Sequence, residues 1–115
     1  MTNVHDLVGQ EVSAVAFVRD YVELHFDGPI LRSLSNPRVT SRAAASVRFP
    51  DPGSRDALCG VIGSTISSVN LVDDRSLELT TSNDCRITIP LDGASRRGPE
   101  AMHFVRNANE PMQVW

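Results

Sequence analysis

The chain has 115 residues, 41% of them hydrophobic, and a formal net charge of −3 at pH 7, which suits a single domain with its own hydrophobic core over residues 1–115. The negative charge disfavours nucleic acid as a partner, because nucleic-acid-binding proteins normally carry a basic surplus that releases counterions from phosphate. No apolar run approaches the roughly 20 residues that cross a bilayer, and no basic stretch followed by an apolar core marks a secretory signal, so we expect a cytoplasmic protein that does not enter a membrane.

The first half of the chain begins with a short helical turn and a strand. Residues 3–8 can form a single turn, which Gly9 ends because glycine adopts the left-handed backbone of a helix terminus without strain. β-branched and aromatic residues are concentrated at 12–18, which favours a strand there. The polar pair Arg19-Asp20 then marks the turn that closes this strand.

A β-hairpin is the clearest local signal in the sequence. Apolar and polar side chains alternate over 21–26, and the Asp27-Gly28 pair that follows is typical of a tight hairpin turn. The partner strand is expected at 30–32. A polar connection over 35–42 then leads to a fourth strand at 45–49.

The second half repeats this order of elements. Asp51 and Ser54 are helix-capping residues. The apolar spacing over 57–62 favours a helical turn, which Gly63 ends. Short alternating segments follow, separated by polar turns and by a polar connection over 92–98. We therefore expect strands at residues 65–72, 77–80, 85–89 and 101–105, and a terminal strand at 112–115.

The two halves also align with one another, which predicts an internal duplication of residues 1–50 as residues 51–105. The fold expected from this pattern is mostly β, of the α+β class, with antiparallel pairing throughout. Each of the two similar units would contain a short helical turn and three to four strands, arranged as a sandwich or a barrel. The aligned pairs include Gly9 and Gly63, Val15 and Val69, Glu23 and Glu78, Ile30 and Cys85, and Phe49 and Phe104.

Several polar side chains share one face of the predicted strand at 21–26. Glu23, His25 and Asp27 stand at alternate positions, where side chains two residues apart are separated by roughly 6.6 to 7 Å. That spacing cannot bring all three to one metal ion, so no metal site is expected. Arg32 lies near His25 across the hairpin, which suits an anionic ligand, an acidic loop of a partner or an ordinary surface ion pair.

Two further features have a structural and a functional interpretation. Glu23 and Glu78 hold equivalent places in the two halves, so they are either paired carboxylates across a pseudo-two-fold axis or two separate outward-facing glutamates. Trp115 is the only tryptophan and the final residue, where it either anchors an interface or docks on its own domain.

The two cysteines, Cys59 and Cys85, fit no metal-ligand or redox spacing. Cys85 aligns with Ile30, and Cys59 lies beside Leu58, so both are expected to be small buried hydrophobic residues. The sequence assembles neither a phosphate-binding loop with its lysine nor a serine-hydrolase elbow. These observations favour a protein that is not an enzyme and that uses no cofactor.

Segments 24–28, 58–63 and 98–104, together with the ending Val114-Trp115, resemble a family of small uncharacterised bacterial proteins of about this length. Some proteins of this type are immunity partners that bind a toxin. The resemblance therefore implies a bacterial protein that binds another protein, and it implies no catalytic residues.

The function expected from the sequence is a non-enzymatic module that binds another protein or a second copy of itself. Exposed edge strands are templates for pairing between chains, which would give a homodimer. The alternative is a small-molecule-binding protein or enzyme with a cleft between the two halves, lined by Glu23, His25, Glu78 or His103. The residues assigned to binding are Glu23, His25, Arg32, Glu78, His103 and Trp115.

Overall fold

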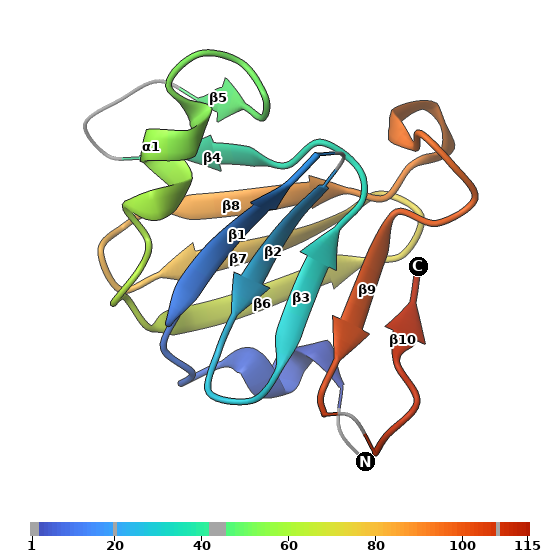
Figure 1. Ribbon diagram of the computed structural model, residues 1–115, viewed down its shortest axis with the longest axis horizontal. Helices are drawn as coiled ribbons and strands as arrows, with labels where there is room; N and C mark the ends of the chain where they lie inside the picture. The colour runs from blue at the N-terminus through green and yellow to red at the C-terminus, as the bar shows by residue number, and fades with distance from the viewer. Residues whose placement is uncertain (1–2, 20, 42–45, 108) are drawn as a thin grey trace.

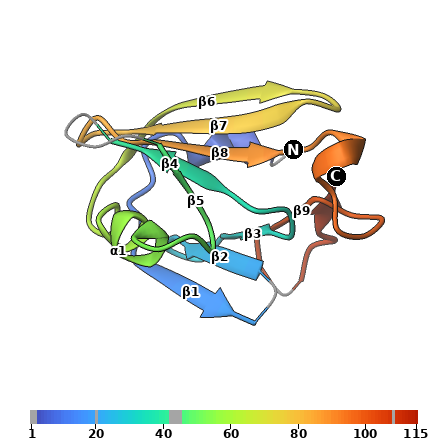
Figure 2. The same cartoon turned by 90° about the horizontal axis from the view of Figure 1, so that it is seen from above.

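Two antiparallel five-stranded sheets face each other in two layers (Figures 1 and 2). They belong to the computed structural model of the chain, which describes residues 3–19, 21–41, 46–107 and 109–115. The front sheet, which faces the viewer in Figure 1, consists of β1 (Ala14–Val18), β2 (Tyr21–His25), β3 (Ile30–Ser33), β9 (Met102–Val105) and β10 (Gln113–Val114), in that order. The back sheet consists of β5 (Val47–Arg48), β4 (Arg38–Thr40), β8 (Arg86–Pro90), β7 (Ser76–Thr81) and β6 (Ile66–Val72). The predicted class, mostly β with antiparallel sheets, is confirmed.

Alternation along the strands explains why the two layers pack. In β2, Val22 and Leu24 are buried, while Glu23 between them lies on the outer face. β7 repeats this pattern around Glu78. A slip of one residue in either strand would turn its glutamate toward the core, so the apolar interior fixes the register of both sheets.

Short helical segments lie beside the outer strands. η1 (Val4–Leu7) packs against β6, and the residues after it bond to the same strand: Gly9 N–H donates to Ile66 O at 2.8 Å, and Ile66 N–H donates to Gln10 O at 2.9 Å. α1 (Ser54–Cys59) packs against β4 and β5 of the back sheet and against β1 of the front sheet. η1 and the residues after it therefore cover the Ile66 end of the edge strand β6, while the opposite edges end in the two-residue strands β5 and β10.

Local sequence accounts for the ends of η1. The Asn3 side chain accepts a hydrogen bond from His5 N–H at 2.8 Å, and the Asp6 side chain accepts one from Asn3 N–H at 3.0 Å, which together form a capping box. Gly9 follows with a φ of 89°, as the predicted helix stop requires. Within the described residues, no helix is long and apolar enough to cross a membrane.

The two halves of the chain exchange strands between the sheets. β1, β2 and β3 lie side by side in the front sheet, and the next strands, β4 and β5, join the back sheet beside β8. The second half does the reverse, because β9 and β10 join the front sheet beside β3. The two sheets therefore have the same strand order when each strand of the first half is matched to its counterpart in the second half, β1 to β6 through β5 to β10. The origin of both halves in one duplicated unit stays a prediction, because equal strand order does not require a common sequence.

The structure differs from expectation in the connections. The connection predicted at 35–42 contains β4, which takes beside β8 the place that β9 takes beside β3. The strand predicted at 45–49 is the short edge strand β5. The alignment matched it to residues 101–105, which form β9, and this match is wrong because β9 has the place in its sheet that β4 has in the other. Only Val39 of β4 is buried, too little for an alternation in the sequence to reveal the strand. Asp20 and residues 42–45 lie outside the described residues.

The connection predicted at 92–98 contains a further short helical segment, η2 (Gly93–Ser95). It lies between β8 and β9, where the chain passes from the back sheet to the front sheet.

Candidate functional site

Five side chains form a continuous hydrogen-bonded row on the outer face of the front sheet, which we call the polar row. Glu23 lies opposite Arg32 in the strand register, and Arg32 lies opposite His103, so their side chains meet across three strands. Its bonds are His25 Nε2 to Glu23 Oε1 (3.1 Å), Arg32 Nε to Glu23 Oε2 (2.7 Å), Arg32 Nη1 to His103 Nδ1 (3.0 Å) and His103 Nε2 to Glu100 Oε1 (2.9 Å).

The centre of the polar row is largely shielded from water. The Glu23 side chain is 14% exposed and the His103 side chain 10%. Burial alone would raise the pKa of Glu23, but the hydrogen bonds from Arg32 and His25, together with the charge of Arg32, lower that pKa below the ordinary value of a carboxyl group. Glu23 is therefore a carboxylate at neutral pH, and the Arg32 guanidinium balances its charge.

Hydrogen-bond chemistry decides which histidine nitrogens carry protons. A guanidinium has no acceptor, so Arg32 donates to Nδ1 of His103, and that nitrogen holds a lone pair. Nε2 of His103 then carries the proton that it donates to the Glu100 carboxylate. Nε2–H of His25 donates to Glu23 in the same way. His103 is thus a neutral imidazole in this arrangement.

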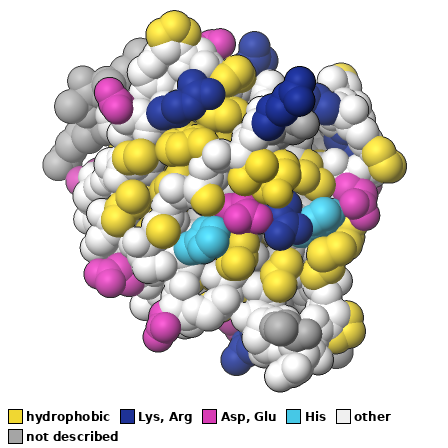
Figure 3. Space-filling model, viewed as in Figure 1, with side chains coloured by type: hydrophobic (Ala, Val, Ile, Leu, Met, Phe, Trp, Pro, Cys, Tyr) yellow, Lys and Arg dark blue, Asp and Glu magenta, His cyan; other side chains and the backbone are white. Residues whose placement is uncertain are grey.

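Apolar side chains border the polar row. Figure 3 shows a line of histidine, acidic and basic side chains across the middle of the face, with hydrophobic side chains on both sides of it. The Tyr21 ring centre lies 5.6 Å from the Arg32 guanidinium carbon, within cation–π range. The apolar and aromatic residues at outward positions of this face are Ala14, Ala16, Val18, Tyr21, Ile30, Val105 and Val114.

The outer face of the back sheet has a different composition. Hydroxyl, amide and charged side chains dominate it, although the sheet has the same number of strands. Its outward residues are Arg38, Thr40, Arg48, Ser68, Asn70, Val72, Ser76, Glu78, Thr80, Arg86, Thr88 and Pro90. An ordinary solvated sheet face has this polar character, whereas large exposed apolar patches mark interaction sites.

The structure brings together most of the residues that the sequence assigned to binding. Glu23, His25, Arg32 and His103 all belong to the polar row. Sequence reasoning linked the first three through the hairpin, but it missed Glu100 and the contact of His103 with Arg32. The pairing of β3 with β9 creates that contact, and no local sequence pattern predicts a pairing between residues so far apart in the chain.

Glu78 lies apart from the polar row. It is on the outer face of the back sheet, where it pairs with Arg86 Nε at 3.4 Å. Glu23 and Glu78 thus occupy opposite outer faces of the molecule and do not form a carboxylate pair. Glu23 and Glu78 therefore do not line one cleft between the two halves, as the alternative with a cleft between the halves allowed.

Trp115 docks on its own chain. Its backbone N–H donates to Met102 O at 2.9 Å, and its backbone carbonyl oxygen accepts from Ala101 N–H at 2.6 Å. The ring is partly buried against the core. Of the two interpretations of this residue, the structure shows the docking one.

The cysteines differ from one another. Cys85 is buried, as predicted, and Cys59 is exposed, so that prediction was wrong for Cys59. Leu58 is the residue at the end of α1 that turns toward the core, which leaves its neighbour Cys59 outside. Both thiols are free.

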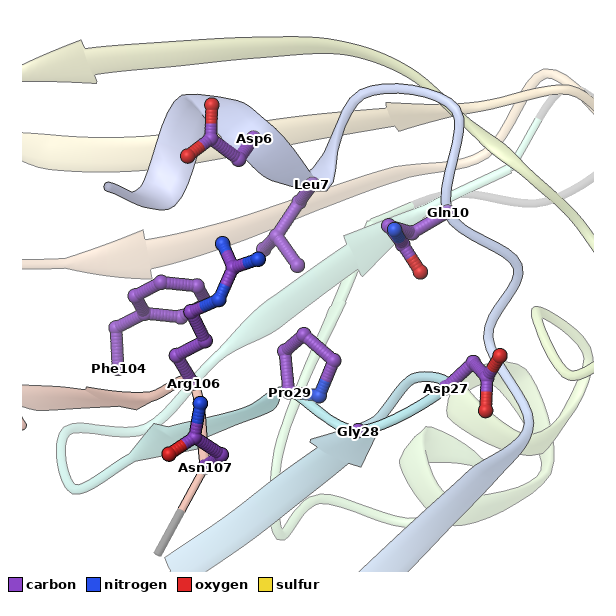
Figure 4. A pocket seen from close by; sticks show the side chains of 9 residues that line it. All are labelled: Asp6, Leu7, Gln10, Asp27, Gly28, Pro29, Phe104, Arg106 and Asn107. Carbon is purple, nitrogen blue, oxygen red and sulfur yellow. The ribbon is translucent and has the colours of Figure 1, made fainter. Parts of the chain in front are cut away.

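A pocket of about 260 Å³ opens beside η1, away from the polar row (Figure 4). η1, the turn between β2 and β3 and the end of β9 surround it, so both halves of the chain contribute. Leu7 and Phe104 give it an apolar floor, and the side chains of Arg106 and Gln10 point into the space above Pro29. None of the residues that the sequence assigned to binding lines this pocket.

Among the residues that the structure describes, no group of three or more histidine, cysteine, aspartate or glutamate side chains is placed to hold a metal ion. No protein-family model, curated protein or solved structure matches the chain. The geometry of the polar row and its surroundings is thus the basis for assigning a function.

Proposed function

We propose that this protein is a non-enzymatic module that binds another protein on the outer face of its front sheet. The contrast between the two outer faces carries this proposal. Both sheets bury an equivalent inner face, yet only the front sheet presents apolar side chains around a shielded set of charges. Such a centre, with arginine and tyrosine beside partly exposed aliphatic groups, has the composition of protein interfaces.

Two of the four sheet edges offer little backbone for pairing with another chain. η1 and the residues after it lie against β6, and α1 packs against β1. The remaining edge strands, β5 and β10, offer only two residues each. Pairing with a strand of another chain at β5 or β10 therefore has little free backbone to use.

Charge favours a partner other than a second copy. Two front faces stacked about a two-fold axis through the row would place Arg32 of one chain over Arg32 of the other. Each chain also has a net charge of −3, so copies repel one another while a basic partner is attracted. A basic protein with a flat apolar surface fits both features. A toxin held by an acidic immunity protein, as the resemblance implies, is one such partner.

The polar row supports binding better than catalysis. Its carboxylates and imidazoles are engaged with each other, and its members include no serine, threonine or cysteine nucleophile. Small-molecule binding is a second candidate, favoured by the pocket of Figure 4 because both halves line it.

Val114 and Val72 provide a matched test, because they are 43% and 42% exposed and lie on the front and back outer faces. A photo-crosslinking amino acid in place of Val114 should give one discrete protein adduct in cells of the source organism, and the same amino acid in place of Val72 should not. The adduct partner is then purified and its binding to the intact chain measured by calorimetry. We expect Val114→Arg to weaken binding at least tenfold and Val72→Arg to leave it unchanged.

Two results would contradict the proposal. One is crosslinking from the two positions to the same mixture of proteins. The other is equal affinity of both arginine variants for the purified partner. Circular dichroism of the variants shows whether the fold is intact, so that a loss of binding is assigned to the face.

A further inference from the structure

His103 holds its place in the polar row only as a neutral imidazole. Its Nδ1 accepts from Arg32, and its Nε2–H donates to Glu100. A proton added to Nδ1 would remove the acceptor and leave two cations about as close as the present 3.0 Å contact. Histidine is the side chain whose ordinary titration falls between pH 5 and 8.

The groups around His103 respond differently to a proton on its Nδ1: one hydrogen bond is lost and the other is kept. Arg32 on β3 opposes the added charge, and Glu100 just before β9 favours it. On β10, the residue opposite His103 is Val114, which carries no charge. Beyond Arg32, the Glu23 carboxylate already pairs with the guanidinium. Protonated His103 therefore keeps Glu100 and loses Arg32.

His25 responds to acid in the opposite sense, although it belongs to the same row. Its Nε2–H donates to Glu23 in the neutral form and in the protonated form alike. A proton on His25 adds an attractive charge to an existing bond, and nothing in the row has to move. Protonation of His25 therefore changes only the charge of the face, whereas protonation of His103 also breaks a bond of the polar row.

We infer that the front face is a pH-responsive docking surface: acidification protonates His103, breaks its bond to Arg32 and opens the polar row between β3 and β9. The opened row no longer presents the arrangement that the partner binds, and affinity falls. This last step rests on the proposed function, whereas the break itself is a property of the free protein.

Nuclear magnetic resonance of the free protein tests the break. At pH 7.5, the ring nitrogens of His103 should show a protonated Nε2 and an unprotonated Nδ1. Between pH 7.5 and 5.0, protonation of Nδ1 should share one midpoint with shifts of the Arg32 Nε–H and of the backbone amides of β3 and β9. The amides of β7 in the back sheet should not follow that midpoint.

Two glutamine variants separate the histidines. In His103→Gln, the amide oxygen can accept from Arg32 and the amide nitrogen can donate to Glu100, so the neutral pattern persists and the shifts in β3 and β9 should vanish. In His25→Gln they should remain. The inference is wrong if His103 keeps the unprotonated Nδ1 down to pH 5.0, or if His103→Gln shows the same shifts as the natural chain.

Binding to the purified partner at pH 7.5 and 5.5 tests the consequence. We expect affinity about tenfold lower at pH 5.5, the effect of losing one charge-assisted hydrogen bond, and no such change in His103→Gln. Equal affinity of the natural chain at both pH values would overturn the regulation and leave the docking face in place. A clear break in the free protein, with no binding to any partner crosslinked from position 114, would instead overturn the proposed function.

Discussion

At the scale of single residues, Glu23 and Glu78 show how burial changes the contribution of a glutamate–arginine ion pair to stability. Each is an outward glutamate on a central strand that pairs with an arginine of the next strand, at 2.7 Å for Glu23 and 3.4 Å for Glu78. The Glu23 side chain is 14% exposed and that of Glu78 is 34% exposed. Water therefore screens the second pair more than the first, and in the first pair the hydrogen bond and charge of Arg32 help to lower the pKa of Glu23.

We predict that Glu23→Gln lowers the free energy of unfolding at pH 7 by about 1.5 kcal/mol, the lower end of the usual range for a hydrogen bond to a charged group. Glu78→Gln should change it by less than about 0.5 kcal/mol. Because the folded protein lowers the pKa of Glu23, the unfolded chain binds this proton more readily, and the stabilisation is present above the unfolded pKa and lost as pH falls through the folded one. Urea unfolding at pH 7, 5 and 3 should show the Glu23→Gln difference shrinking toward pH 3. A difference that grows in acid would contradict this sign.

At the scale of secondary structure, the sequence predicted elements with strong local signals and missed those that depend on a distant partner. The hairpin of β2 and β3, with its alternation and Asp-Gly turn, lies where it was expected. The short helical turn before Gly9 does as well. β4 was missed because three residues with one buried side chain carry no readable period. The polar row shows the same limit, since Glu23 and Arg32 are neighbours in a hairpin while His103 joins them only through the pairing of β3 with β9.

The terminal element β10 offers a test of what a two-residue strand contributes. Trp115 bonds to the backbone of Ala101 and Met102 and packs its ring on the core, so this segment covers the free edge of β9. We predict that removing residues 112–115 lowers the free energy of unfolding by about 2–4 kcal/mol, through lost apolar contacts and unpaired backbone groups. Urea titration followed by circular dichroism measures the loss. Trp115→Phe, which keeps a ring and all backbone bonds, should lose less than half as much. An unchanged midpoint for the truncated chain would show that β10 contributes nothing.

At the scale of the whole molecule, the exchange of strands makes the two halves depend on each other. β4 and β5 from the first half complete the back sheet, and β9 and β10 from the second half complete the front sheet. A half taken alone would leave β3 or β8 with an open edge and one face of its strands without the opposing layer. Burial of a shared apolar interior is the main stabilising term, so we expect that neither half alone holds enough of it to fold.

This dependence predicts one cooperative unfolding transition for the intact chain, with the same midpoint by far-ultraviolet circular dichroism and by the fluorescence of Trp115. Fragments 1–50 and 51–115 should each be unfolded in isolation, because each lacks the strands that its partner inserts. Mixed at equal concentration, they should regain β-sheet circular dichroism as a one-to-one complex, since the contacts between the halves survive the break between residues 50 and 51. If fragment 51–115 alone gave a cooperative transition, the second half would be an independent folding unit. The exchange of strands would then be a later docking step and not the basis of the fold.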